Sequence, residues 1–204
     1  MSARVAVLAS GSGSNLQALL DDTEVGPHIV LVLSDVPGAG ALDRARLAGV
    51  PAEVADRAGF ASRAEFDDAI LARLRAAEAD TVLLAGFMRI LGPQIVRAFP
   101  NRILNVHPSL LPAFPGAHAV REALAWGAKV TGCTVHLVDE QVDHGPAVLQ
   151  EPIEILEGDD EDSLHTRIKE AEHRLFPRAA GWLVAGRLVV EGRSVRVLRV
   201  GAAR

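Results

Sequence analysis

Short apolar runs recur along the first half of the chain, and stretches with a helical spacing of apolar residues separate them. Between residues 63 and 77, for example, Phe66, Ile70 and Leu74 fall on one face of a helix, and Ser62 is a suitable N-cap. The apolar runs are rich in Val, Leu, Ile and Ala, as buried parallel strands are, and they cover residues 4–9, 28–34, 52–55, 81–85 and 102–107. Strands that alternate with helices predict a doubly wound α/β sheet with parallel strands.

The second half of the chain departs from this alternation. Residues 129–138 form a long strand-like run, a polar turn follows, and residues 147–150 return as a strand, so we expect an antiparallel pair. An acidic run at 158–163 suits the start of a final long helix, and residues 187–197 predict a hairpin. We therefore predict a Rossmann-like, mostly parallel α/β sheet with an antiparallel C-terminal part. We expect a single domain over residues 1–204, with halves of about 1–100 and 101–204.

The composition narrows the classes of function. Hydrophobic residues make up 49% and charged residues 23% of the 204 positions, which is typical of a globular protein. A net charge of −5, without any run of Lys or Arg, argues against a nucleic-acid partner, and no apolar segment has the length of a membrane span. The single cysteine, Cys133, excludes an internal disulfide, and the histidines lack metal-ligand spacing. We expect a cytoplasmic protein with small-molecule ligands, no metal, no nucleic acid and no membrane contact.

Two polar residues on one strand face are the first candidates for chemistry. Asn105 and His107 stand two positions apart in the run that ends at Pro108, so their side chains point the same way, about 7 Å apart along the strand. Burying two polar groups is costly unless each finds a partner. An amide and an imidazole can donate together to an oxygen that becomes negative, which predicts an oxyanion site. The alternative is an Asn and a His whose polar atoms are satisfied by the backbone.

A glycine-rich loop follows the first strand and precedes a helix, with the sequence Ser-Gly-Ser-Gly-Ser-Asn over residues 10–15. Glycines allow close backbone approach and the amides at the helix start attract anions, so the loop suits a phosphate group. A dinucleotide site is the main alternative, because Asp35 stands where a ribose-binding acid would. However, Leu16 replaces the third glycine of that fingerprint, and no P-loop lysine follows. A structural turn capped by Ser14 or Asn15 is a third interpretation.

A polar turn offers a third group for the oxyanion site. Asp143 precedes His144 in the sequence Asp-His-Gly-Pro, and we expect its carboxylate to face the Asn105/His107 pair. A carboxylate beside an imidazole raises the pKa of the histidine, so we predict a His107 that is charged near neutral pH. The alternative is an ordinary turn aspartate that binds its own backbone. We expect His136 to be a plain strand residue and assign no role to His144.

Four motifs together resemble the phosphoribosylglycinamide formyltransferase family, folate-dependent enzymes of purine synthesis. They are the glycine-rich loop at 11–15 and the segments 85–91, 105–112 and 143–146, and the resemblance runs to at least Pro177. It implies the formyltransferase fold and direct transfer of the formyl group of 10-formyltetrahydrofolate to the amine of phosphoribosylglycinamide, through a tetrahedral intermediate. It requires no metal and leaves a homodimer open.

The resemblance also implies roles for individual residues. Asn105, His107 and Asp143 would be catalytic, and Glu172 would bind the ribose hydroxyls. The substrate phosphate would be held by Gly13, Ser14 and Asn15. The folate would be bound by Arg63, Met88, Arg89, Ile90, Leu91, Asn105, Val138, Asp139, Glu140 and Asp143.

Three alternatives to this function stay open at the level of sequence. Formyltetrahydrofolate hydrolase shares this set of Asn, His and Asp, but normally carries an additional N-terminal regulatory domain. Methionyl-tRNA formyltransferase shares the same core, but is usually basic and carries an extra C-terminal domain. A sugar-phosphate-binding module without catalytic activity would explain the glycine-rich loop, but it would leave Asn105, His107 and Asp143 without a purpose.

Overall fold

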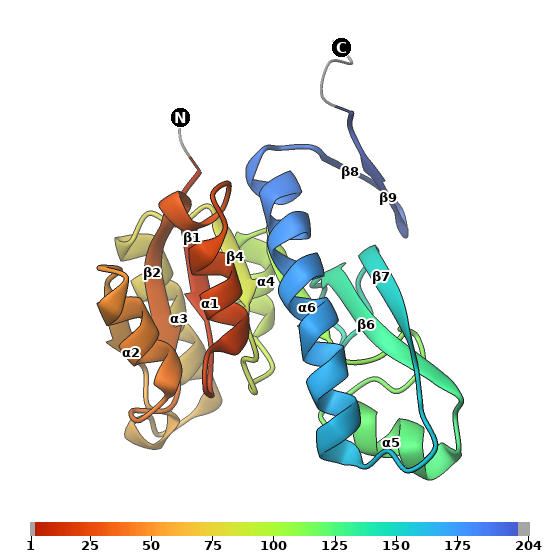
Figure 1. Cartoon of the computed structure of the whole chain (residues 1–204). Coiled ribbons are helices and arrows are strands. Elements are labelled where there is room, and N and C mark those ends of the chain that lie inside the picture. The colour runs from red at the N-terminus through yellow and green to blue at the C-terminus, as the bar shows by residue number, and fades with distance from the viewer. Residues whose placement is uncertain (1–2, 200–204) are drawn as a thin grey trace. The chain divides into compact units, whose positions relative to one another are not determined.

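The computed structural model of the chain describes residues 3–199, and its contacts divide the chain into two compact units. The first unit is Met1–Leu104 and the second is Asn105–Arg204, so that strand β5 (Ile103–His107) crosses the boundary. The hydrogen-bonded order of the seven-stranded sheet is β3-β2-β1-β4-β5-β6-β7, and β8 and β9 form a separate two-stranded sheet. Figure 1 labels the elements of both units. The predicted sheet, mostly parallel with an antiparallel C-terminal part, is confirmed.

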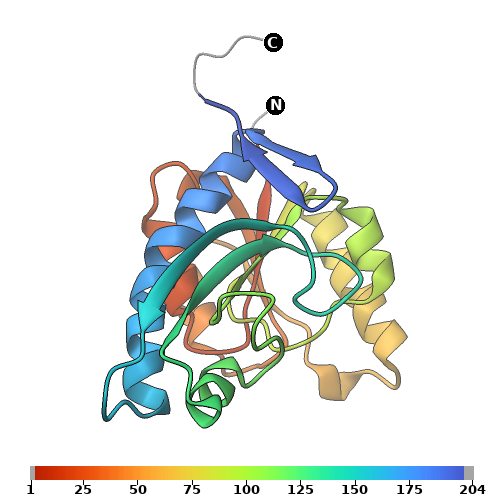
Figure 2. The same cartoon turned by 90° about the vertical axis from the view of Figure 1, so that its right-hand side faces the viewer.

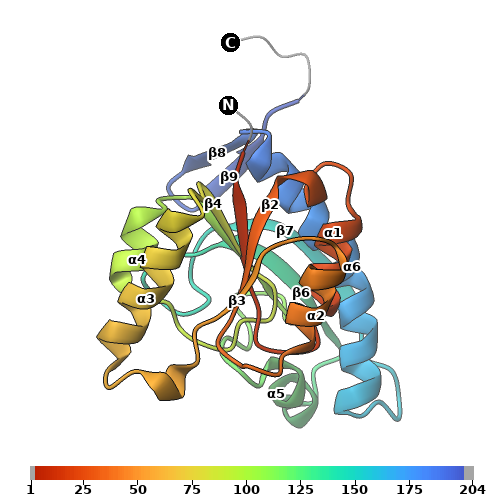
Figure 3. The same ribbon diagram turned by 90° about the vertical axis from the view of Figure 1, so that its left-hand side faces the viewer.

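The first unit alternates strands and helices as predicted. Its strands pair in parallel and are β1 (Val5–Leu8), β2 (Ile29–Ser34), β3 (Ala52–Val54) and β4 (Thr81–Leu84). Helices α1 and α2 cover one face of these strands and α3 and α4 cover the other, as Figure 3 shows. The helices are α1 (Ser14–Asp21), α2 (Gly40–Leu47), α3 (Arg63–Ala76) and α4 (Pro93–Ala98), with short 3₁₀ turns at Gly26–His28 and Arg57–Gly59.

The core of the first unit lies between this sheet and its helices. Every residue of β1 and β4 is buried, as expected for central parallel strands that are covered on both faces. The predicted apolar face of α3 is buried as well, because Phe66, Ile70 and Leu74 are each at most 2% exposed. Each such side chain contributes about 1.5–3 kcal/mol to folding. Ser62 caps α3 as predicted, since its hydroxyl accepts a hydrogen bond from the amide of Glu65.

The second unit combines an antiparallel pair with a long helix. Its elements after β5 are α5 (Ala119–Trp126), β6 (Val130–Leu137), β7 (Ala147–Glu154), α6 (Glu161–Val184), β8 (Leu188–Glu191) and β9 (Ser194–Val197). The antiparallel pairing of β6 with β7 is confirmed, and β7 continues to Glu154 because it pairs with β6 as far back as Val130. Helix α6 packs against both strands.

The acidic run before α6 acts as a helix start, as predicted. Asp160 caps the helix by accepting a hydrogen bond from the amide of Ser163, and the Ser163 hydroxyl binds back to the Asp160 amide. Asp159, which precedes the helix, pairs with Arg167 eight residues further along the chain. Across residues 3–199, none of the helices is both long and apolar enough to cross a membrane.

The glycine-rich loop enters α1 through Gly13 rather than through a capping side chain. Gly13 is the N-cap with φ of 76°, and neither Ser14 nor Asn15 caps the helix, so that interpretation was wrong. The loop packs closely on α2, where the Gly11 carbonyl oxygen accepts from the Ala41 amide at 3.1 Å. A Cβ atom at Gly13 would lie 2.7 Å from the Cα of Ala41. The position therefore needs glycine both for its left-handed backbone and for space.

We predict that Gly13→Ala destabilises the protein by about 2 kcal/mol, because it combines a left-handed φ with a steric clash. Gly11→Ala is the matched control in the same loop, since a Cβ there meets nothing within 4 Å. The free energy of unfolding, measured by urea denaturation, should fall for the first variant and change by less than about 0.5 kcal/mol for the second. Equal stabilities of the two variants would contradict this account of the loop.

Candidate active site

The end of β5 places Asn105 and His107 in the second unit with polar partners for both side chains. The pattern along the strand leaves Asn105 partly exposed and buries His107. The Nδ2 of Asn105 lies 3.1 Å from Nε2 of His136, and Nε2 of His107 lies 2.8 Å from the carbonyl oxygen of Phe114. Both side chains thus meet the cost of burial through hydrogen bonds.

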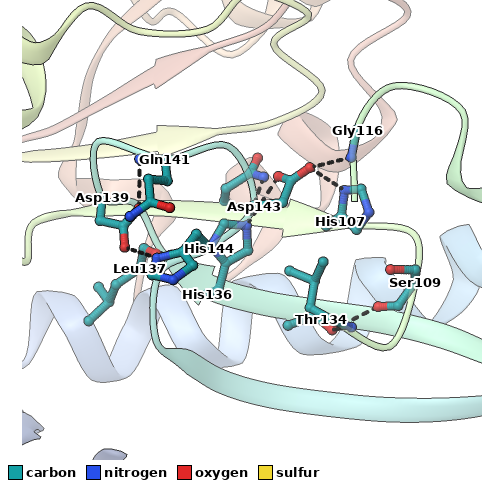
Figure 4. A network of polar contacts seen from close by, with 12 residues as sticks. His107, Ser109, Gly116, Thr134, His136, Leu137, Asp139, Gln141, Asp143 and His144 are labelled. Atoms are coloured by element: carbon teal, nitrogen blue, oxygen red, sulfur yellow. Dashed lines mark hydrogen bonds and ion pairs between the residues drawn. The ribbon is translucent and has the colours of Figure 1, made fainter. Parts of the chain in front are cut away.

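Asp143 lies between two histidines, as Figure 4 shows. Its Oδ2 is 3.4 Å from Nδ1 of His107, and its Oδ1 is 3.7 Å from Nε2 of His136. The Gly116 amide donates to Oδ2 at 2.7 Å. The carboxylate therefore faces the Asn105/His107 side as expected, and the interpretation of Asp143 as an ordinary turn residue is not needed. Its backbone has φ of 50°, a conformation that Asp tolerates better than most residues.

His136 does more than the plain strand residue that we expected. Its Nδ1 lies 2.9 Å from the carbonyl oxygen of Leu137, which can only accept, so this nitrogen carries the proton. In the neutral ring Nε2 is then an acceptor, and it receives an N–H from Asn105. His136 consequently fixes which way the Asn105 amide points. No sequence signal marked this role, because a histidine inside a strand is most often a core residue.

Burial and charge set the protonation states of the cluster. Burial alone would raise the pKa of Asp143, but the neighbouring His136 ring, the Gly116 amide and the His107 ring together lower it below its ordinary value. Burial lowers the pKa of His107, and the Asp143 carboxylate and the Phe114 carbonyl oxygen oppose this only in part. The predicted rise in the pKa of His107 is therefore wrong in direction, because the cost of desolvating the charged ring exceeds the attraction of one carboxylate.

The segment after β5 folds back over His107 and is held from β6. The Thr134 hydroxyl donates to the Ser109 carbonyl oxygen at 2.7 Å and accepts from the Leu111 amide at 3.0 Å. The Leu111-Pro112 peptide bond is cis. Phe114, with φ of 50°, then turns its carbonyl oxygen onto His107. The loop thereby occupies one ring nitrogen of the candidate catalytic histidine.

The turn that carries Asp143 has its own network, which includes the predicted residue Asp139. The carboxylate of Asp139 accepts from the Gln141 amide at 2.9 Å and lies 2.7 Å from Nδ1 of His144. Val138 is partly buried at the start of the turn and Glu140 is exposed. Gly145 closes it, and a Cβ there would lie 1.8 Å from the Leu137 carbonyl oxygen, so only glycine fits.

In the first unit, a buried aspartate joins the glycine-rich loop to the loop after β4. Asp35 accepts a hydrogen bond from the Ser10 hydroxyl at 2.6 Å and pairs with Nε of Arg89 at 2.7 Å. The Met88 amide donates to the same hydroxyl at 2.8 Å. Asp35 is therefore committed to these partners, which removes the main support for a dinucleotide site. Arg44, which sequence reasoning missed, also supports the loop by donating to the Ser12 carbonyl oxygen at 2.8 Å.

Four of the five predicted folate residues of the first unit line one pocket of about 310 Å³, whose lining residues are Arg57, Arg63, Phe66, Met88, Arg89 and Ile90. Arg63 donates to the Ile90 carbonyl oxygen at 3.0 Å and so ties α3 to this loop. Met88 and Ile90 are 64% and 58% exposed. Leu91 is buried and is not among the lining residues. Arg57 and Phe66 are additions to the predicted set.

Glu172 and Cys133 are both buried in the second unit. Glu172 lies in α6 and is 4% exposed. The pKa of the Cys133 thiol is raised to about 12 by burial and by the nearby charges of Glu172 and Glu151, so Cys133 is an inert core residue. Within residues 3–199, no group of three or more His, Cys, Asp or Glu side chains could hold a metal ion.

Comparisons with known proteins agree on one family. The sequence model described as formyl transferase matches residues 3–180. The chain is 48% identical to phosphoribosylglycinamide formyltransferase of Mycobacterium tuberculosis over 96% of this chain and 94% of that protein. It resembles the crystal structure of glycinamide ribonucleotide transformylase 1 from Symbiobacterium toebii with a TM-score of 0.93 and 51% identity, covering 97% of this chain and 95% of the other.

A longer relative extends the similarity to animals. The chain is 50% identical, over 92% of its length, to the trifunctional purine biosynthetic protein adenosine-3 of Drosophila melanogaster, of which it spans 14%. The family model alone matches most of the chain, and it includes β1, β5 and the Asp143 turn. The resemblance drawn from the four motifs is thereby confirmed: this chain belongs to the formyl transferase family.

Proposed function

We propose that the chain transfers the formyl group of 10-formyltetrahydrofolate to the amine of 5-phosphoribosylglycinamide, a step of purine synthesis. The observation that carries this proposal is the enclosed cluster of Asn105, His107 and Asp143 in a chain of the formyl transferase family. The names of the bacterial relatives that match nearly full length support this choice of acceptor. Their names do not include a hydrolase or a transfer-RNA enzyme.

The first chemical step forms a tetrahedral intermediate whose negative charge is stabilised by Asn105 and His107 of β5. The substrate amine attacks the formyl carbon, and the formyl oxygen becomes an oxyanion. Asn105 has two amide N–H groups and gives one to His136, so the other can donate to the oxyanion. His107 supplies a second donor from its ring. No covalent bond to the protein is needed.

The second step expels the folate nitrogen and requires a proton transfer. The bond between the formyl carbon and the folate nitrogen breaks, and the proton lost by the attacking amine ends on that nitrogen. The His107 ring can take up this proton and pass it on, with Oδ2 of Asp143 3.4 Å from its Nδ1. Asp143 stays ionised throughout and stabilises the ring whenever it is charged.

Substrate binding must also release His107 from its present partner. Nε2 donates to the Phe114 carbonyl oxygen, and Nδ1 faces Asp143, so neither nitrogen is open to an oxyanion. We infer that the backbone around Phe114 moves aside and that the oxyanion takes the place of its carbonyl oxygen. Phe114 holds a left-handed φ of 50°, which costs a non-glycine residue free energy, so release of this conformation would offset part of the cost of the movement.

The remaining predicted residues would bind the two substrates. The amides of the loop around Gly13, Ser14 and Asn15 would hold the phosphate, at the start of an α-helix without a side-chain cap. The exposed apolar and cationic groups around Met88 and Arg63 would take the folate, which has an aromatic ring system and carboxylates. The further residues proposed to contact the folate are Arg89, Ile90 and Leu91 of the first unit and Val138, Asp139 and Glu140 of the second, and Glu172 would bind the ribose.

The acceptor is tested by mixing the purified protein with 10-formyltetrahydrofolate, with and without glycinamide ribonucleotide. We expect loss of the formyl folate and formylation of the ribonucleotide only when both substrates are present. Release of formate without the ribonucleotide would identify a hydrolase instead. No turnover under either condition, together with retained ribonucleotide binding, would favour the sugar-phosphate-binding module.

We predict that His107→Ala and Asp143→Asn each lower kcat by about a hundredfold to a thousandfold, because they remove a donor and the charge that supports it. Asn suits the left-handed backbone at position 143, so the second variant removes charge without adding backbone strain. His165→Ala, in α6, serves as a histidine control without a proposed role. Rates near those of the unmodified protein in both site variants would refute the assigned roles.

The protonation of His107 gives a prediction that does not depend on turnover. Its pKa is lowered from 6.5, so an NMR titration of the ring carbon-bound protons should show a midpoint below 6.5. Asp143→Asn should lower the midpoint further, because the Asp143 charge is the largest influence that opposes burial. The resonance can be assigned from the spectrum of His107→Ala. A midpoint above 6.5, or a rise in the variant, would contradict this description of the site.

A further inference from the structure

The C-terminal hairpin contacts the turn that carries Asp143. The hairpin, formed by β8 and β9, lies beyond the residues 3–180 that the family model matches. Its strand β9 packs near β7, whose start follows directly from the turn (Figures 1 and 2). At the tip of the hairpin, Arg193 donates through Nη2 to the His144 carbonyl oxygen at 2.7 Å, and its Nη1 lies 3.2 Å from Nε2 of the same residue.

The protonation pattern makes these contacts a continuous chain of hydrogen bonds. The Asp139 carboxylate can only accept, so the 2.7 Å contact places the ring proton of His144 on Nδ1. Nε2 of the neutral ring is then an acceptor for the Arg193 guanidinium. Asp139 in turn accepts from the Gln141 amide. Burial raises the pKa of Asp139, but the contacts with His144 and the Gln141 amide outweigh it and keep the group ionised.

This chain fixes the backbone on one side of Asp143. His144 is the next residue, and Arg193 binds both its carbonyl oxygen and its ring. On the other side, the Asp143 carboxylate is held by the Gly116 amide. Asp143 itself has φ of 50°, which its surroundings must maintain. The rigid fork of a guanidinium suits this two-point attachment, and a lysine ammonium does not.

We propose that Arg193 is a positioning residue, which holds the turn 139–144, and with it Asp143, in the arrangement that formyl transfer needs. The proposal rests on the function proposed above for Asp143 and for the folate-binding segment 138–143. Under this proposal the hairpin, which lies outside the residues that the family model matches, supports the reaction by holding the turn. Arg193 acts through His144 and touches neither substrate.

The first test measures the turn itself and needs no substrate. Amide hydrogen exchange is followed by NMR or mass spectrometry in the full-length protein and in Arg193→Ala. We expect the Gln141 amide and the peptide covering 139–145 to exchange about tenfold faster in the variant. Arg196→Ala is the matched control, because Arg196 is another exposed arginine of the same hairpin and pairs with Glu191 instead. Unchanged exchange in Arg193→Ala, or an equal increase in Arg196→Ala, would overturn the proposal.

The second test separates positioning from general stability. We expect Arg193→Ala to raise the KM for formyl folate about fivefold while the KM for the ribonucleotide stays the same, because the phosphate-binding loop is untouched. Arg193→Lys should restore less than half of this loss, since one ammonium replaces a two-point contact. A lower melting temperature with both KM values unchanged would show a merely structural role and overturn the proposal.

A third variant keeps the failure of this inference distinct from failure of the proposed function. His144→Ala removes the ring that links Arg193 to Asp139, so adding Arg193→Ala to it should change the KM for formyl folate by less than twofold. Fully additive effects would overturn the linkage through His144. A further outcome is that Asp143→Asn leaves turnover intact while amide exchange in the turn still responds to Arg193→Ala. That result would refute the proposed catalytic role of Asp143, and with it the share of Arg193 in the reaction. The contact between Arg193 and His144 would still hold the turn in place.

Discussion

The proposed active site depends on one ionised carboxylate, Asp143, held in a largely buried position. A carboxylate that loses water without compensation becomes protonated. Asp143 avoids this through the Gly116 amide, which donates to it, and through the rings of His107 and His136, each of which can take up a proton beside it. Its charge in turn determines what its neighbours can do. The Asp143 charge favours a second proton on the His107 ring, and His136 can accept from Asn105 only while its own Nε2 stays unprotonated. If Asp143 became neutral, a second proton on the His107 ring would no longer be stabilised by this charge.

The regular parts of the fold were predictable because hydrophobic spacing reports burial directly. The parallel strands, the antiparallel return of β7 and the acidic start of α6 all follow from local patterns. The N-cap of α1 was not predictable in this way, because Gly13 enters that helix in a left-handed conformation and packs on Ala41, a residue 28 positions away. Contacts at such sequence distance leave no periodic signal in a single sequence.

The same difference separates the predicted and the missed residues of the site. Asn105 and His107 could be found because two polar residues on a strand face are unusual in themselves. The roles of His136, Asp35 and Arg193 depend on partners, and each of these residues alone resembles a core histidine, a ribose-binding acid or a surface arginine. The direction of the His107 pKa was missed for a related reason. A sequence can suggest a neighbouring charge, but the extent of burial that opposes it is known only from the fold.

A lowered pKa at His107 is consistent with catalysis and sharpens how it would work. In the resting protein the neutral ring carries its proton on Nε2, and Nδ1 faces the Asp143 carboxylate without a proton between them. When the attacking amine loses a proton as the oxyanion forms, both the oxyanion and Asp143 favour a positively charged ring. The ring then donates from both nitrogens, one to each negative group. The interaction is therefore stronger in the transition state than in the resting site, which is the condition for a binding interaction to accelerate a reaction.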